Sequence, residues 1–395
     1  MMRAKFVFTL NLAIMVVGCQ DAFLADGQAV SAFIQKRSIT VGDQHFVIDE
    51  YNPFYSSCSL RPVFRVPNLV ITEKGTMLVA CENRDIFDDT GPIDVLVSRR
   101  SNLADDWVVT KEFCYDYPKM DHSRSMNPTF CIDTSGVHGA RGRIFLFASR
   151  ISSNVRYAFE AKSKDIDFVY KYSDDDGITW SPEYSIKNKW VSSQYEGVIP
   201  SPANGVQTAD GSLIIPTMVI TEGFYKSGLC IKPVGGDWFF SSPSPTSGDN
   251  ECTVYIDNNY QIVLDCRTTS GIRRKYIYNE DDDSFSLIDG SFPIVMDLKA
   301  EISRFNWQNK NLYFLTFCDS TRNIRENISL WGSKNGMNWR KVFQMTEGDA
   351  ITAYSNISYG SGILAAVYED YDEGIRIQDF TPLKDIVFSI VANTE

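Results

Sequence analysis

The fold can first be inferred from one short stretch, Ser173-Asp-Asp-Asp-Gly-Ile-Thr-Trp180. It has the pattern S-x-D-x-G-x-T-W. In this pattern Asp and Gly favour a turn that bonds its own backbone, and the terminal aromatic side chain anchors the turn in a sheet. Degenerate copies follow the same order at 101–107, 280–285 and 333–339. One complete turn and three partial ones, each beside a strand-like run, indicate a structural repeat.

Short apolar runs of β type surround these turns. Many of them begin after Gly, Asn or Asp, as the strands of hairpins do. The clearest runs lie at 75–81, 143–149, 212–217, 261–265, 312–317 and 362–368. No long amphipathic helix follows the N-terminal region. Widely spaced repeats that each carry several short strands predict an all-β fold, a six-bladed β-propeller of four-stranded antiparallel sheets.

The N-terminus has the pattern of an export signal. Arg3 and Lys5 precede an apolar run at 6–17, which is too short to span a bilayer. We expect a signal peptide at 1–18, a leading segment at 19–45 and a single domain at 46–395. The small residues before Cys19 fit either ordinary cleavage or the bacterial lipoprotein pattern, which would lipidate Cys19. The predicted location is therefore secreted, periplasmic or at the cell surface, without a transmembrane helix.

Charge and composition exclude several classes of function. The 395 residues carry a formal net charge of -12, which argues against a nucleic-acid partner because such binding usually needs a basic face. An anionic ligand would have to meet a local cluster of arginines. The chain has only three histidines, and its cysteines lack zinc-site spacing. We therefore expect no metal, no cofactor and no histidine-based catalytic triad.

A second motif, Phe64-Arg-Val-Pro67, resembles the F/Y-R-I-P motif that opens sialidase (neuraminidase) domains. The Asp-rich turns are similar to the Asp boxes of the same family, and the likeness extends from about 64 to 369. This resemblance implies an exo-sialidase, a retaining glycoside hydrolase that removes terminal α-linked sialic acids. Its partners would be the sialylated glycans of glycoproteins, glycolipids and oligosaccharides.

Sialidases bind the carboxylate of their substrate with three arginines. The resemblance gives this role to Arg65, Arg267 and Arg325, which stand in similar sequence contexts and in the family's order. Guanidinium forks hold a planar carboxylate in one orientation better than lysine ammonium groups do. The resemblance also implies that Glu369 orients Arg65 and that Arg84 lies near the substrate.

The segment Ala353-Tyr354-Ser-Asn-Ile357 resembles the family's nucleophile strand. The resemblance therefore makes Tyr354 the nucleophile and Glu251 the base that activates it. Sialidases are an exception among retaining glycosidases, most of which use a carboxylate. A sialoside carries a carboxylate on its anomeric carbon, so a neutral phenol can approach where a second carboxylate would be repelled. A phenol with a pKa of about 10 needs such a base at neutral pH.

The general acid of the family lies in the loop that here runs from 84 to 94. The candidates are Asp85, Asp88 and Asp89. Counted back from the Ile-Asp pair at 93–94, Asp89 matches the family position best, and Asp88 is the second choice. One departure from the family is Asn127, in Met-Asn-Pro-Thr, where relatives often have Asp. For that reason, the resemblance does not assign Asn127 a contact with the amino-substituted side of the sugar.

Strand periodicity also bears on two cysteines. If Glu251 and Arg267 face the site from paired strands, Cys252 and Cys266 share the opposite face. A cross-strand disulfide is one hypothesis, and two buried thiols between blades are the alternative.

Two other functions stay open at this point. A trans-sialidase, including the intramolecular kind, would use the same residues and differ in how its acceptor pocket excludes water. A propeller lectin would bind sialic acid without cleaving it, and would be expected to have lost its nucleophile or its acid. Tyr354, Glu251 and a loop aspartate are all present, which favours an enzyme.

Overall fold

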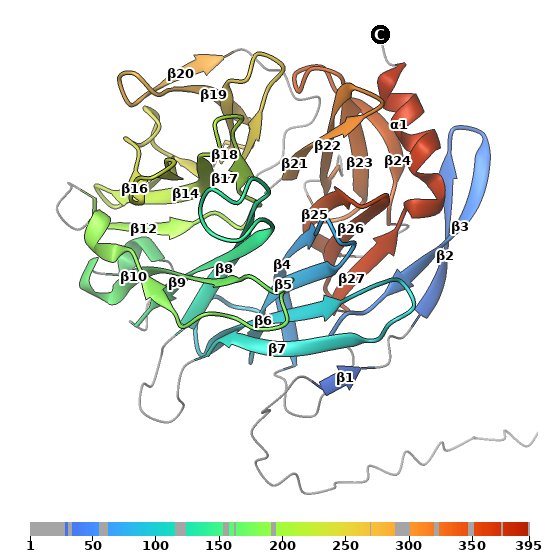
Figure 1. Ribbon diagram of the computed structural model, residues 1–395, viewed down its shortest axis with the longest axis horizontal. Helices are drawn as coiled ribbons and strands as arrows, with labels where there is room; N and C mark the ends of the chain where they lie inside the picture. Colours follow the sequence, from blue (N-terminus) through green and yellow to red (C-terminus); the bar gives the residue numbers. More distant parts are fainter. Residues whose placement is uncertain are drawn as a thin grey trace, which may run out of the picture.

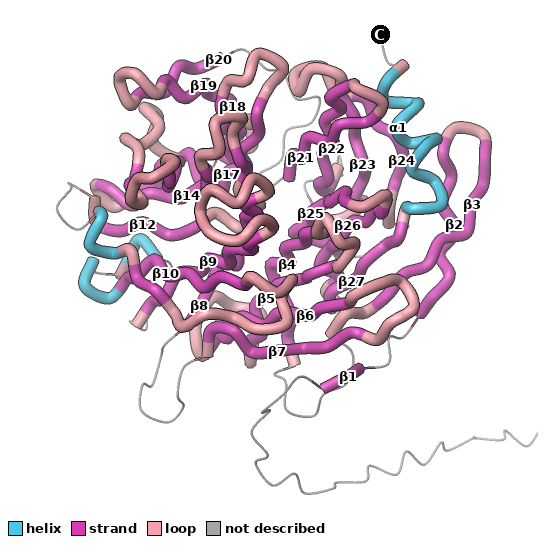
Figure 2. Tube along the Cα trace, viewed as in Figure 1, coloured by secondary structure: helices cyan, strands magenta, loops and turns pink. Residues whose placement is uncertain are grey.

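The strands of the protein form small antiparallel sheets that surround a common centre (Figure 1). The computed structural model describes residues 28–30, 34–54, 62–114, 124–152, 158–161, 163–190, 195–268, 270–288, 301–319, 324–346, 351–372 and 374–393. Strands predominate over helices throughout this part of the chain (Figure 2). The predicted all-β propeller fold is confirmed. The predicted export signal at 1–18 and Cys19 lie outside the described residues.

The first sheet has nine strands and contains two successive meanders. Their strands are β4 (Val63–Ile71), β5 (Met77–Arg84), β6 (Ile93–Arg100), β7 (Trp107–Phe113), then β8 (Arg124–Asp133), β9 (Arg143–Ile151), β10 (Ile166–Ser173) and β11 (Tyr184–Ser185). The short strand β1 (Gln28–Val30) pairs with β7. A single parallel pair, Ile93 with Arg124, joins the two meanders.

Three further sheets follow along the chain. The first contains β12 (Gly197–Pro200), β13 (Val206–Gln207), β14 (Leu213–Thr221), β15 (Phe224–Lys232) and β16 (Phe239–Phe240). The second contains β17 (Asp249–Ile256), β18 (Ile262–Thr268), β19 (Arg274–Asn279) and β20 (Ser284–Ile288). The third contains β21 (Glu301–Trp307), β22 (Lys310–Cys318), β23 (Ile328–Ser333) and β24 (Arg340–Gln344). Short 3-10 helices lie at Ala158–Glu160, Ser163–Asp165 and Lys187–Lys189.

The last sheet joins the beginning of the described fold to its end. Its strand order is β2 (Ile34–Val41), β3 (Gln44–Tyr51), β27 (Gly374–Asp379), β26 (Ile363–Asp370) and β25 (Thr352–Gly360). The buried carboxylate of Glu50 on β3 accepts hydrogen bonds from Arg37 at 2.9 Å, Tyr368 at 2.7 Å and Gln378 at 2.8 Å. The fold therefore includes residues 34–45, which the sequence placed ahead of the domain.

The observed sheets differ in detail from uniform four-stranded blades. Hydrogen bonding gives five sheets in the described residues, with four, five or nine strands each. The nine-stranded sheet arises because two meanders are joined at one parallel pair, and the last sheet gains strands from the beginning of the chain. The count of six blades stays a prediction.

The six apolar runs predicted from the sequence all coincide with strands, namely β5, β9, β14, β18, β22 and β26. Each of them is the second strand of its meander. Neighbouring sheets cover both of its faces, and every residue of β5, for example, is buried. A strand covered on both faces has no polar side, so it reads as a continuous apolar run.

One helix was not anticipated, α1 (Lys384–Ala392), which follows a 3-10 turn at Thr381–Leu383. Its residues Val387, Phe388 and Val391 are buried. Phe388 contacts Trp307 and Phe314 on the sheet formed by β21–β24. The helix is too short for its apolar face to stand out in the sequence. No helix within the described ranges is long and apolar enough to cross a membrane.

The four repeated turns occupy equivalent positions, each between the third and fourth strands of its meander. In the complete copy, the carboxylate of Asp175 accepts the Thr179 N–H at 2.8 Å, and the Ser173 hydroxyl accepts the Gly177 N–H at 2.8 Å. In the copy at 333–339, Asn335 replaces the aspartate and accepts the N–H of Met337 at 2.9 Å. The turn therefore depends on a side-chain oxygen at this position rather than on a charge.

Cys252 and Cys266 are directly opposite one another on β17 and β18, and both are buried. Both are free thiols. The predicted shared face is confirmed, and the structure supports the buried-thiol alternative over the disulfide.

The substitution Gly177→Ala should destabilise the fold. Gly177 has a φ of +79°, and a Cβ atom there would lie 2.6 Å from Cδ2 of the buried Leu78. Backbone strain and overpacking of about 1–3 kcal/mol each should lower the urea midpoint of unfolding. Gly142→Ala is the control, because its φ is +82° with nothing within 4 Å. It should show the backbone effect alone, and equal losses in the two variants would contradict a role for the contact with Leu78.

Candidate active site

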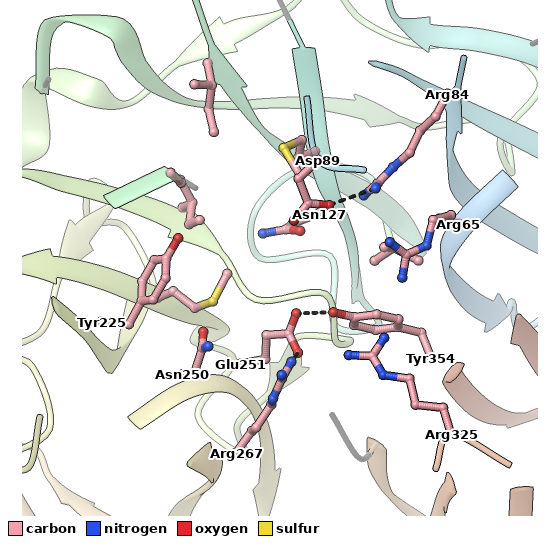
Figure 3. A pocket seen from close by; sticks show the side chains of 16 residues that line it. Arg65, Arg84, Asp89, Asn127, Tyr225, Asn250, Glu251, Arg267, Arg325 and Tyr354 are labelled. Carbon is pink, nitrogen blue, oxygen red and sulfur yellow. Dashed lines mark hydrogen bonds and ion pairs between the residues drawn. The ribbon is translucent and has the colours of Figure 1, made fainter. Parts of the chain in front are cut away.

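A cavity of about 330 Å³ lies where the inner strands of several sheets converge. In Figure 3 the labelled side chains point inward from different parts of the ribbon. The predicted site residues that line it are Arg65, Arg84, Asp89, Glu251, Arg267, Arg325 and Tyr354. The eighth, Glu369, is fully buried and bonded to Arg65. The structure therefore brings together residues that are spread over most of the chain.

Irregular strand pairing occurs at each of the inner strands that carries a principal site residue. The register shifts at 65–68 in β4, at 126–129 in β8, at 249–252 in β17 and at 352–355 in β25. Such a bulge bends a strand and changes the direction of its side chains. Arg65, Asn127, Glu251 and Tyr354 all fall within these segments, so the bulges help to set their directions.

Two short hydrogen bonds at the centre of the cavity join Glu251 to Tyr354 and to Arg267. The phenol donates a hydrogen bond to Oε1 at 2.6 Å, and Arg267 Nη1 donates to Oε2 at 2.6 Å (Figure 3). Burial raises the pKa of the Tyr354 phenol, and the charge of Glu251 raises it further, although nearby arginines lower it in part. The phenol is therefore neutral at rest and has a carboxylate in place to accept its proton.

Arg65 is held by Glu369. Its Nε donates to Oε1 at 2.8 Å, and the backbone N–H of Val66 donates to Oε2 at 3.1 Å. Val66 has a φ of +54°, an uncommon conformation for a β-branched residue. Pro67 follows it and has no N–H that the bulge could leave unpaired. One buried carboxylate thus fixes both the guanidinium and the bulge, as the resemblance implied for Glu369.

Arg84 is held in a parallel way by Glu82, a fully buried residue that the sequence did not single out. Arg84 Nε donates to Oε2 of Glu82 at 2.7 Å, and Nη2 of the same guanidinium bonds the same oxygen. The backbone N–H of Asn127, whose φ is +58°, donates to Oε1 at 2.7 Å. Pro128 follows Asn127, as Pro67 follows Val66. A second buried carboxylate therefore fixes an arginine and a bulge together.

Asp89 lies in the cavity wall with its side chain 40% exposed. Arg84 Nη1 donates to its Oδ1 at 2.7 Å, and Arg124 donates to its backbone carbonyl (Figure 3 shows the first contact). Asp85 and Asp88 are not among the lining residues, and Asp88 offers its carbonyl to Arg84 at 3.2 Å. Of the three loop aspartates, Asp89 alone meets the cavity, which favours the first choice from the sequence.

Arg325 is positioned by Tyr371. Its Nη1 donates to the phenol oxygen at 3.3 Å, and the ring of Tyr371 lies 5.9 Å from the guanidinium carbon of Arg65. The ring of Phe87 packs edge-on against Tyr371 with centroids 5.4 Å apart. Tyr371 therefore contacts two of the three arginines that the resemblance assigns to carboxylate binding.

Sequence reasoning missed several residues of the site, which are Glu82, Arg124, Tyr225, Asn250 and Tyr371. The signal for Tyr371 was available, since it lies two residues after Glu369 and so on the same face of the chain if the strand continues. Asn250 directly precedes Glu251, so regular strand alternation would place it on the opposite face, but both residues lie within the register shift at 249–252 and line the cavity. Glu82 carried no signal of its own, because it directly follows the apolar run at 75–81 and begins a polar stretch.

The charged groups of the cavity wall suit an anionic ligand. Four arginines and two carboxylates line it, in a chain whose formal net charge is -12. Guanidinium groups that converge on one point bind a carboxylate in a fixed orientation. Within the described part of the chain, no group of three or more His, Cys, Asp or Glu residues is placed to hold a metal ion.

Comparison with known proteins gives matches to one family model and to sialidases. Residues 77–366 match the model of the BNR repeat-like domain family. The chain is similar to a sialidase of Clostridium perfringens, with 23% identity over 352 residues, covering 82% of this chain and 90% of that protein.

Solved structures show the same fold. The structure resembles Trypanosoma rangeli sialidase in complex with 2,3-difluorosialic acid, described as a covalent intermediate, with a TM-score of 0.73 and 16% identity. That match covers 84% of this chain and 56% of the other, so the chain spans little more than half of that protein. The intramolecular trans-sialidase from Ruminococcus gnavus matches with a TM-score of 0.64 and 15% identity, covering 82% of this chain and 93% of that one. The resemblance to sialidases that the motifs predicted is therefore confirmed, and the chain belongs to the BNR repeat-like domain family.

Proposed function

We propose that this protein is an exo-sialidase that hydrolyses terminal α-linked sialic acids from glycans, with retention of anomeric configuration. The observation that carries the proposal is the hydrogen bond of 2.6 Å from Tyr354 to Glu251 inside a cavity lined by arginines. The match to sialidases over most of the chain supports it.

Substrate binding is assigned to Arg65, Arg267 and Arg325. All three line the same cavity as Tyr354, and the guanidinium carbon of Arg65 lies 5.8 Å from the Tyr354 ring centroid. A carboxylate held by these groups would keep the anomeric carbon, to which it is attached, beside the phenol. Fixing the reacting atoms in this way lowers the entropic cost of the attack.

In the proposed reaction, the oxygen of Tyr354 attacks the anomeric carbon while its proton passes to Glu251. Asp89 gives a proton to the departing glycosidic oxygen, and a covalent sialyl–enzyme forms. Asp89 then takes a proton from a water molecule that attacks the same carbon. The phenolate leaves and recovers its proton from Glu251, so both displacements balance and the configuration is retained.

Two further parts of the proposal come from the sequence. The first part is an export signal at 1–18, which would direct the protein out of the cytoplasm. Removal of this signal would either expose Cys19 for lipidation or leave a protein without a lipid anchor. The partners are sialylated glycans, bound without a cofactor.

Transfer of sialic acid, rather than hydrolysis, is the second candidate. It is favoured by the match to an intramolecular trans-sialidase, which covers 93% of that chain. The central residues serve either reaction, since only the acceptor that meets the intermediate differs. A lectin without catalysis is less consistent with the contact between Tyr354 and Glu251, because binding alone needs no activated phenol.

Tyr354→Phe should abolish turnover, because phenylalanine has no oxygen to form the bond. We expect kcat with an aryl sialoside to fall by at least about a thousandfold, as for other lost nucleophiles. Tyr359→Phe is the control, since Tyr359 lies further along the same strand and outside the cavity. Incubation with 2,3-difluorosialic acid followed by peptide mass spectrometry should place the adduct on Tyr354. Full activity of Tyr354→Phe, or an adduct on another residue, would refute this assignment.

Asp89→Ala should slow cleavage in a way that depends on the leaving group. For sialyllactose, whose sugar hydroxyl leaves only when protonated, kcat/KM should fall by about 100- to 10,000-fold. For an activated aryl sialoside the loss in kcat/KM should be much smaller, because its phenolate leaves unaided. Asp88→Ala is the matched control and should behave like wild type. The reverse ranking of the two variants would move the acid to Asp88.

Product analysis separates hydrolysis from transfer. With a sialylated glycoprotein as donor and lactose in excess, a hydrolase should release mainly free sialic acid. The products can be resolved by chromatography with mass detection. Sialyllactose as the main product, or an anhydro sialic acid formed within the donor, would replace hydrolysis by intermolecular or intramolecular transfer.

A further inference from the structure

The acid loop presents a chemical conflict. Asp89 has to carry a proton to act on the leaving group, yet its Oδ1 accepts a hydrogen bond of 2.7 Å from the cationic Arg84. A cation beside a carboxylate favours the ionised form and so works against the acid. A second cation, Arg124, bonds the carbonyl of the same residue. An acid in this position needs something that offsets these charges.

Glu82 is placed to offset them. It is fully buried, and its Oε2 accepts both Nε and Nη2 of Arg84, on the side of the guanidinium away from Asp89. Its Oε1 accepts the N–H of Asn127 at 2.7 Å. Burial raises the pKa of Glu82, whereas Arg84 and the N–H of Asn127 lower it in part, because each of them donates to an oxygen of the carboxylate and so favours its ionised form. Arg84 is therefore shared between a buried carboxylate behind it and Asp89 in front.

We propose that Glu82 is a positioning residue that neutralises Arg84 and thereby lets Asp89 keep its proton at the pH of catalysis. The inference rests on the proposed function and adds a residue to it. Glu82 does not line the cavity, so it acts through Arg84 and not on the substrate. Arg84 on β5 interacts electrostatically with Glu82, Asp89 and Arg65, and Arg124 on β8 interacts with Asp89, Arg84 and Glu82. The cations of this group already outnumber its one carboxylate besides Asp89, so removing the negative charge of Glu82 makes the surroundings of Asp89 more positive still.

Glu82→Gln tests the proposal, because it removes the charge and keeps the size and one acceptor oxygen. A more positive surrounding favours ionised Asp89, so the acid should lose its proton at lower pH. The basic limb of the kcat/KM profile for sialyllactose should therefore move down by about one pH unit. The same limb for an activated aryl sialoside should stay in place, since that reaction does not need the acid. A merely structural role would lower kcat for both substrates and leave both limbs where they were, and that result would overturn the proposal.

Glu50→Gln is the matched control. Glu50 is also a fully buried carboxylate bonded to an arginine, at 2.9 Å, but it lies on β3 outside the cavity. Its variant should keep both limbs at the positions of wild type. A shift of the sialyllactose limb in this variant equal to that in Glu82→Gln would show a nonspecific effect and would also overturn the proposal.

A second variant covers the case in which Glu82→Gln does not fold, since it leaves Arg84 buried without its partner. The double variant Glu82→Gln/Arg84→Gln removes both charges and also the hydrogen bond to Asp89. Its sialyllactose limb should lie at or above the wild-type position, and a limb below wild type would contradict the proposal. Absence of turnover by wild type with both substrates would instead reject the proposed function, and this inference with it.

Discussion

Four arginines share one small cavity in this protein, and their mutual repulsion has to be offset for the cavity to exist. Burying a cation without a partner costs several kcal/mol. Each of the four donates to an oxygen that the fold supplies. Arg65 donates to Glu369, Arg84 to Glu82, Arg267 to Glu251 and Arg325 to Tyr371. The cavity can therefore hold guanidinium groups aimed at an anion although the chain as a whole is acidic.

Two of these acceptors also fix the backbone. Glu369 and Glu82 each bind an arginine with one oxygen and, with the other, the N–H of a residue at positive φ. The bonds of Glu369 reach 303 residues along the chain to Val66, and those of Glu82 reach 45 residues to Asn127. In both cases the same carboxylate pairs with an arginine and stabilises a strand bulge. Loss of either carboxylate would release a side chain and a strained backbone together.

The sequence was sufficient for those parts of the molecule that leave a local pattern. The second strand of each meander is covered on both faces and appears as an apolar run, and the turn at 173–180 bonds within itself. Tyr354 and the three arginines proposed to bind the substrate carboxylate stand in motifs that resemble a known family. Glu82 could not be found in this way, because the role of a carboxylate near the polar end of β5 depends on Arg84 and on Asn127 on another strand. The joining of β3 to β27 likewise depends on pairing between distant segments.

Helix α1 was missed for a related reason. Its buried residues Val387, Phe388 and Val391 lie on one face of a helix of only nine residues. A short apolar segment of this kind is equally consistent with a strand. What selects the helix is packing against Trp307 and Phe314 on a sheet that precedes it in the chain.

The link between Tyr354, Glu251 and Arg267 bears on when the proposed nucleophile, Tyr354, becomes active. Burial and the charge of Glu251 raise the pKa of the phenol, so it is protonated before substrate arrives. Arg267 bonds the other oxygen of Glu251 at 2.6 Å, which favours the ionised carboxylate and opposes its taking the proton. In the proposed reaction, the substrate carboxylate shares the charge of Arg267 and weakens that opposition. Glu251 then accepts the proton more readily, so the anion that identifies the substrate also promotes the attack on it.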